Sequence, residues 1–78
     1  MTNIEKYNQS FIETFEITAE NLTALSYQSI PAWDSVGHMG LIATLEETFD
    51  IMMETDHIIE FESYVKGIEI LKSYEIEF

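Results

Sequence analysis

Residues 31–49 limit the fold of this chain more than any other part of its sequence. Pro31, the only proline, has a fixed φ and disfavours helix at the residue before it. Asp34 and Ser35 follow, and both are residue types that cap helix N-termini well. Apolar residues then recur at steps of three or four, namely Val36, Met39, Ile42, Leu45 and Phe49. This spacing predicts an amphipathic helix over residues 35–49.

Ser35 is expected to present its hydroxyl at the N-terminus of this helix. A helix N-terminus offers unpaired N–H groups and a partial positive charge, so it tolerates a phosphate well. A serine there could carry a phosphodiester without burying its charge. Ser35 or Asp34 could equally serve only as a helix cap, and the spacing alone leaves both interpretations open.

The residues around Ser35 resemble the attachment motif of acyl carrier proteins of the free-standing bacterial type. The family signature is Asp-Ser-Leu followed by an apolar helix that ends in Leu-Glu-x-x-Phe. This chain has Trp33-Asp34-Ser35-Val36, then Leu41, Leu45-Glu46-Glu47 and Phe49. In that family the serine bears 4′-phosphopantetheine, and the thiol of this arm carries an acyl group as a thioester. The length, the acidic balance and the four-helix pattern also agree, so the likeness covers nearly the whole chain.

The resemblance implies one all-α acyl carrier domain over residues 1–78, a small bundle of three longer helices and one short helix with a long first loop. Such a chain is not an enzyme. A phosphopantetheinyl transferase loads it from coenzyme A, and it passes acyl intermediates between enzymes of fatty-acid-like or specialised metabolism. Asp34 and Val36 flank the attachment site. Val36, together with Gly37 and Gly40 where the family often has acids, favours a specialised pathway.

Composition excludes several classes of function. The 78 residues allow one small domain, and 46% hydrophobic residues are too many for a disordered acidic tail. The net charge of −12 excludes nucleic-acid binding and favours partners with basic surfaces. There is no cysteine, so disulfides and thiolate metal sites are excluded. Without a signal-peptide pattern or a membrane-length apolar run, we expect a cytoplasmic protein that does not insert into membranes, and its charge favours a monomer.

Three further helices are expected from the same kind of spacing. They cover residues 3–16, 57–61 and 64–74, and their caps are Thr2 or Asn3, Asp56, and Ser63. Their inward residues are predicted to be Ile4, Tyr7, Phe11, Ile12 and Phe15, then Ile58, Ile59 and Phe61, then Val65, Ile68, Leu71 and Tyr74. Residues 75–78 are expected to form a frayed tail.

Residues 17–34 are predicted to form a long ordered loop that delivers Ser35. Its expected anchors are Leu22, Leu25, Tyr27 and Ile30, with a helical turn near residues 19–25. Trp33 either packs the loop against the helix or stays exposed for partner recognition. The two glycines after the serine either leave the backbone open to a partner or reflect loose packing.

The acidic residues are concentrated in one part of the chain. Between residues 34 and 62 there is no lysine or arginine, and the acids are Asp34, Glu46, Glu47, Asp50, Glu54, Asp56, Glu60 and Glu62. This pattern predicts a docking face for basic partners, with Glu46, Glu47, Met39 and Asp56 on it, unless the run is simply a solvated surface. If an acyl chain folds back into the bundle, we expect Val36 and Met39 to line the start of its path, with Leu45 and Ile59 deeper.

Other sites are disfavoured. A Ser35–His38 hydrolase pair lacks the Gly-x-Ser-x-Gly elbow and the sheet that such enzymes need. His57 lies near acids but without metal-ligand spacing, so no metal site is expected. Two alternatives remain: an unmodified acidic helical adaptor that binds a basic partner, and an aminoacyl or peptidyl carrier.

Overall fold

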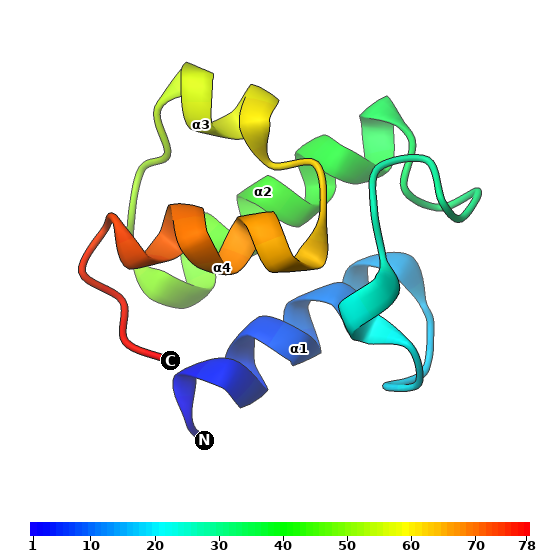
Figure 1. Cartoon of the computed structure of the whole chain (residues 1–78), viewed down its shortest axis with the longest axis horizontal. Helices are drawn as coiled ribbons and strands as arrows, with labels where there is room; N and C mark the ends of the chain where they lie inside the picture. Colours follow the sequence, from blue (N-terminus) through cyan, green and yellow to red (C-terminus); the bar gives the residue numbers. More distant parts are fainter.

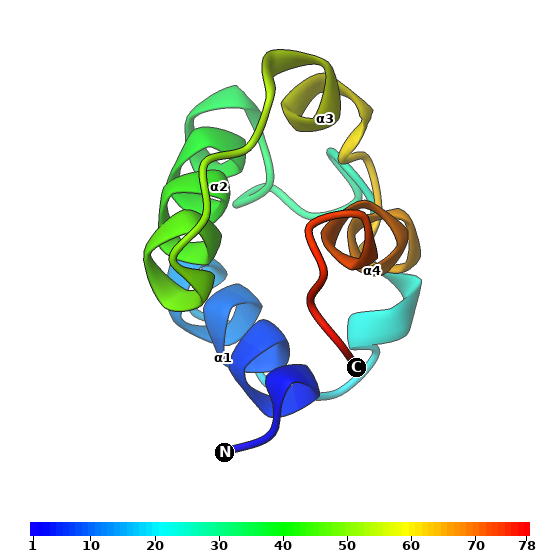
Figure 2. The ribbon, with the colours of Figure 1, turned by 90° about the vertical axis from the view of Figure 1, so that its left-hand side faces the viewer.

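The chain forms four α-helices and one short 3-10 helix, with no β-strand. In the computed structural model, which describes residues 1–78, the order is α1 (Asn3–Phe15), η1 (Leu22–Ala24), α2 (Ser35–Phe49), α3 (Thr55–Glu60) and α4 (Tyr64–Lys72). Figure 1 shows these elements in sequence colours, and Figure 2 shows α2 and α4 on opposite sides with α3 above them. The predicted small all-α domain is confirmed, and the helix bounds differ from those expected by at most two residues.

Side-chain caps begin three of the helices at the predicted residues. Thr2, Asp34 and Ser63 accept the backbone N–H groups of Glu5, Gly37 and Lys66 at the starts of α1, α2 and α4. Such a bond satisfies one N–H that has no partner within the helix. Helix α3 differs, because Glu54 rather than Asp56 is at its cap position and makes no side-chain cap bond.

Aromatic side chains fill the centre of the molecule. The buried aromatic residues are Tyr7, Phe11, Phe15, Trp33, Phe61 and Tyr64. The ring of Phe11 lies 5.0 Å from that of Tyr7, 5.4 Å from Tyr64 and 5.6 Å from Trp33, between ring centroids. Only a glycine fits beside them at position 67 of α4, because a Cβ there would collide with the Tyr7 hydroxyl and the Phe61 ring. The aromatic cluster therefore requires a residue without a side chain at position 67.

Four apolar residues predicted to face inward are instead exposed. Their exposed fractions are 82% for Val36, 54% for Met39, 73% for Ile59 and 57% for Val65. In α2 the reason is geometric. Leu45 lies nine positions after Val36, which is about two and a half helical turns, so the two side chains point to opposite sides of the helix. Leu41, Ile42 and Leu45 form the buried face of α2. The prediction of one continuous stripe from Val36 was wrong.

The C-terminal residues pack onto the domain, contrary to the prediction of a frayed tail. Ile76 is buried, and the Phe78 ring lies 5.5 Å from that of Tyr7 between centroids. The Asn3 side-chain amide donates to the Glu77 carbonyl at 2.9 Å, so the two termini lie together, as Figure 1 shows. Isoleucine and phenylalanine alternate with glutamates here, and an extended segment with this pattern puts its apolar residues on one side.

Tyr7 makes the domain sensitive to alkaline pH. Its hydroxyl donates to the Tyr64 carbonyl at 2.6 Å, and burial raises the pKa of Tyr7 well above its ordinary value of 10.0. Burial also raises the pKa of Tyr64. In the unfolded chain Tyr7 ionises near pH 10, whereas in the folded chain its buried phenol stays neutral above that pH. This stabilisation is therefore complete below pH 10 and is lost as pH rises above it.

We expect the ionisation of Tyr7 to lower the free energy of unfolding by up to about 1.4 kcal/mol per pH unit above pH 10, with a smaller contribution of the same sign from Tyr64. Urea unfolding between pH 8 and pH 11.5 measures this slope. Tyr7→Phe should start less stable by about 1 kcal/mol, from its lost hydrogen bond, and show a shallower alkaline slope. An unchanged slope in Tyr7→Phe would contradict the assignment.

Candidate functional site

The long loop between α1 and α2 is fixed to the start of α4. The backbone N–H of Tyr27 donates to the Glu62 carbonyl at 2.8 Å, and that of Tyr64 donates to the Leu25 carbonyl at 2.9 Å. Leu22 is buried, and η1 falls within the predicted helical turn. Of the other predicted anchors, Leu25 and Ile30 are half-buried, whereas Tyr27 is 38% exposed and lies at the surface. The loop thus reaches α2 along a defined path.

Trp33 locks the end of this loop into the core. Its side chain is fully buried, with its ring centroid 5.3 Å from that of Phe15 and 5.6 Å from that of Phe11. The Trp33 carbonyl also accepts from the N–H of Gln28 at 2.9 Å, which closes the turn before α2. The packing role is confirmed, and Trp33 is not available to a partner.

Ser35 is the first residue of α2, and its side chain is exposed. The cap of this helix is Asp34, whose Oδ1 accepts from the Gly37 N–H at 2.8 Å. The capping role that the sequence left open between the two residues therefore belongs to Asp34. The Ser35 hydroxyl stays at the surface, beside the N–H groups of the first turn.

Gly37 brings the loop close to α2. A Cβ at this position would collide with the carbonyl oxygen of Ala32, and it would lie 3.3 Å from the Phe15 ring. At Gly40 a Cβ would meet only the Thr14 methyl, at 3.7 Å. The first glycine is thus required by tight packing of the loop, which excludes loose packing as its explanation, and the second is not required.

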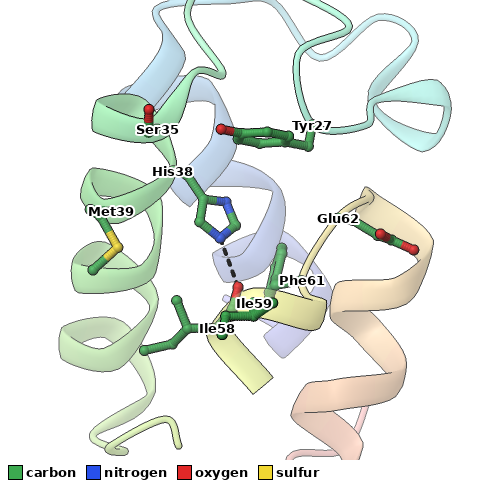
Figure 3. A pocket seen from close by; sticks show the side chains of 8 residues that line it. All are labelled: Tyr27, Ser35, His38, Met39, Ile58, Ile59, Phe61 and Glu62. Atoms are coloured by element: carbon green, nitrogen blue, oxygen red, sulfur yellow. Dashed lines mark hydrogen bonds between the residues drawn. The ribbon is translucent and has the colours of Figure 1, made fainter. Parts of the chain in front are cut away.

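A pocket of about 350 Å³ lies beside Ser35, between α2 and α3. It is lined by Tyr27, Ser35, His38, Met39, Ile58, Ile59, Phe61 and Glu62, and Figure 3 shows how these side chains surround it. Its wall is mostly apolar, and Glu62 and Ser35 supply polar groups. A serine hydroxyl and an apolar pocket therefore share one end of the domain.

The predicted acyl path matches this pocket in part. Met39 and Ile59 line it, whereas Val36 points into solvent and Leu45 is fully buried away from it. Sequence reasoning placed Ile58 and Phe61 in the core and Tyr27 among the loop anchors, without assigning them to a pocket. The spacing of three residues between Ser35 and His38 is the one sequence signal that these two residues share a pocket. In the sequence analysis it supports only the question of whether His38 is a catalytic base.

The predicted docking residues lie on the same part of the molecule but differ in exposure. Glu47 and Asp56 are exposed, and Met39 is about half exposed. Glu46 is half-buried, and its Oε2 accepts from the Met53 N–H at 2.9 Å. Its carboxylate therefore holds the α2–α3 connection, a local role that the charge pattern did not indicate.

Both ring nitrogens of His38 are occupied. The indole Nε1–H of Trp33 donates to Nδ1 at 2.9 Å, and Nε2 is 2.8 Å from the Ile58 carbonyl oxygen. An indole nitrogen can only donate, so Nδ1 must accept and the proton must be on Nε2. With Nδ1 engaged in this way, His38 cannot act as a base toward Ser35.

His57 is held by Tyr74. The Glu54 N–H donates to the Tyr74 hydroxyl at 2.8 Å, and that hydroxyl lies 2.6 Å from His57 Nδ1. No group of three or more histidine, aspartate or glutamate side chains is arranged to hold a metal ion. His57 thus contributes to the packing of α3 against the turn that follows α4.

No protein-family model, curated protein or solved structure matches this chain. None of its helices has the length and apolar character needed to cross a bilayer.

Proposed function

We propose that this chain is an acyl carrier protein whose Ser35 carries 4′-phosphopantetheine. The observation that carries the proposal is the division of roles at the start of α2. Asp34 makes the cap hydrogen bond, and the serine that matches the family motif keeps an exposed hydroxyl beside an apolar pocket. A serine needed only as a cap would have its hydroxyl engaged with the helix.

The residues around Ser35 fit a phosphodiester. The N–H groups of the first turn of α2 and the helix dipole favour a negative charge at this position. No lysine or arginine is needed, and none lies between residues 34 and 62. When bound, the arm supplies a thiol that holds an acyl group as a thioester. The chain itself positions the serine, keeps it exposed and offers apolar side chains next to it.

The surface around Ser35 suits enzymes with basic docking sites. Val36, Met39 and Ile59 expose apolar side chains near it, and exposed carboxylates lie further away, at Glu47 near the other end of α2 and at Asp56 of α3. Such a surface attracts a positively charged partner at long range and offers apolar area for contact. We propose phosphopantetheinyl transferases and acyl-transfer enzymes as the partners. Their association should weaken as salt is raised.

Ser35→Ala should remain folded and lose labelling entirely. Ser35 is exposed and does not cap α2, so the change in free energy of unfolding should stay within about 0.5 kcal/mol. A broad-specificity phosphopantetheinyl transferase with a fluorescent coenzyme A analogue should label the wild type but not the variant, as measured by in-gel fluorescence.

Thr55→Ala is the matched control, because Thr55 is a hydroxyl residue at the first position of α3. It should label like the wild type. Labelling of Ser35→Ala would refute the site. A wild type that several transferases fail to label, yet that binds a basic partner, would instead support the adaptor.

A further inference from the structure

His38 closes the inner end of the pocket beside Ser35. Its imidazole projects from α2 toward α3 and is held at Nδ1 by Trp33 and at Nε2 by the Ile58 carbonyl. Figure 3 shows the second of these bonds at the base of the pocket. The imidazole is nearly coplanar with the Trp33 indole, with planes 14° apart, and it meets the Phe61 ring edge-on at 6.2 Å between centroids. A side chain held by Trp33, Ile58 and Phe61 in this way forms a fixed boundary.

The space behind His38 is filled. Trp33, Leu41, Leu45 and Phe61 have no exposed surface, and of these only Phe61 borders the pocket. A group that enters beside Ser35 therefore meets the imidazole before it can reach the apolar interior of α2. Moving His38 aside would require breaking both of its hydrogen bonds and would leave the buried Trp33 N–H without an acceptor.

The volume of the pocket sets a capacity. A dry cavity of about 150 Å³ accommodates benzene, which is roughly 25 Å³ per non-hydrogen atom. On that scale a pocket of about 350 Å³ holds about 14 such atoms. The apolar side chains of Met39, Ile58 and Ile59 in its wall suit an aliphatic or aromatic group.

We infer that His38 is a specificity-determining residue. By bridging Trp33 and Ile58 it limits the group accommodated beside Ser35 to an apolar one of about a dozen non-hydrogen atoms. A longer chain has to leave its end in solvent. The identity of this group as acyl cargo rests on the proposed function, whereas the size limit rests on the pocket alone.

The absence of cysteine allows a test that needs no transferase. Ser35→Cys places a single thiol at the pocket, and alkyl methanethiosulfonates with chains from butyl to hexadecyl then attach to it as mixed disulfides. We expect the Tm to rise with chain length and to level off at about a dozen carbon atoms, with amide shifts at Ile58 and Phe61 that stop growing at the same length. Thr55→Cys is the control, because Thr55 does not line the pocket, and its series should show no such rise.

Removing the imidazole should move this limit to longer chains. In the Ser35→Cys protein, His38→Ala is combined with Trp33→Phe, so that no indole N–H is left unpaired. The reference is the Ser35→Cys protein with Trp33→Phe alone. We expect the combined variant to keep gaining Tm beyond the length at which the reference levels off, whereas His57→Ala should leave the limit unchanged.

A reference series that rises through hexadecyl, a limit that does not move in the combined variant, or a series with no gain at any length would each overturn the inference. None of these outcomes bears on whether a transferase modifies Ser35.

Discussion

Trp33→Ala is expected to lower the free energy of unfolding by about 3–5 kcal/mol. The indole is fully buried among the rings of Phe11 and Phe15 and donates to His38 Nδ1. Alanine would leave a cavity and an unpaired acceptor. A domain of 78 residues has a total stability of about 4–12 kcal/mol, so this loss is a large fraction of it and should lower the urea midpoint strongly. Urea denaturation followed by far-UV circular dichroism measures the loss.

Trp33→Phe separates packing from hydrogen bonding. Phenylalanine retains a ring beside Phe11 and Phe15 but has no N–H for His38, and we expect a loss of about 1–3 kcal/mol. If Trp33→Ala cost no more than Trp33→Phe, burial of the ring would not be what holds the loop. Loss of the ring in Trp33→Ala should also disturb Ser35, which is two residues further along the chain.

Gly37→Ala and Gly40→Ala are expected to change stability in opposite directions. A methyl group at residue 37 meets the backbone carbonyl of Ala32, which cannot rotate away as a side chain could, and the loop must shift. Overpacking of this kind costs about 1–3 kcal/mol or more, against a gain of about 1 kcal/mol in helix propensity. At residue 40 the added methyl only touches Thr14 at ordinary contact distance, so the gain in propensity should remain.

Thermal unfolding of the two variants measures this difference directly, and each serves as the control for the other. Gly37→Ala should lower the Tm, and Gly40→Ala should raise it by several degrees. The loop displaced in Gly37→Ala is the one that leads to Ser35, so labelling by a transferase should slow in that variant and stay unchanged in Gly40→Ala. An increase in Tm for both would show that the loop has room to move.

The sequence predicted the helices well because their signals are local. Proline, capping residues and apolar spacing each act within a few residues, and Thr2, Asp34 and Ser63 all cap where expected. Burial was predicted less well, because it depends on which side of a helix the neighbours occupy. Val36, Met39, Ile42 and Leu45 follow one another at steps of three residues, with no step of four. Over nine positions this rotation places Val36 on the side of α2 opposite Leu45, in solvent.

The pocket could be predicted only in part. Met39 and Ile59 were predicted to lie on the path of an acyl chain attached at Ser35, and both line the pocket. Tyr27 and Glu62 join it through contacts between residues far apart in sequence, such as the hydrogen bond from the Tyr27 N–H to the Glu62 carbonyl. Likewise, nothing in the charge pattern distinguished Glu46, which accepts the Met53 N–H, from Glu47, which is exposed.

The central claim is that Ser35 is a phosphopantetheine attachment site, and intact-mass spectrometry tests it most directly. The wild-type protein is incubated with coenzyme A and a broad-specificity phosphopantetheinyl transferase, and its fragments are then sequenced. The account predicts a gain of one phosphopantetheinyl unit, located on Ser35. An unchanged mass with several transferases, or a unit located on any other residue, would contradict it.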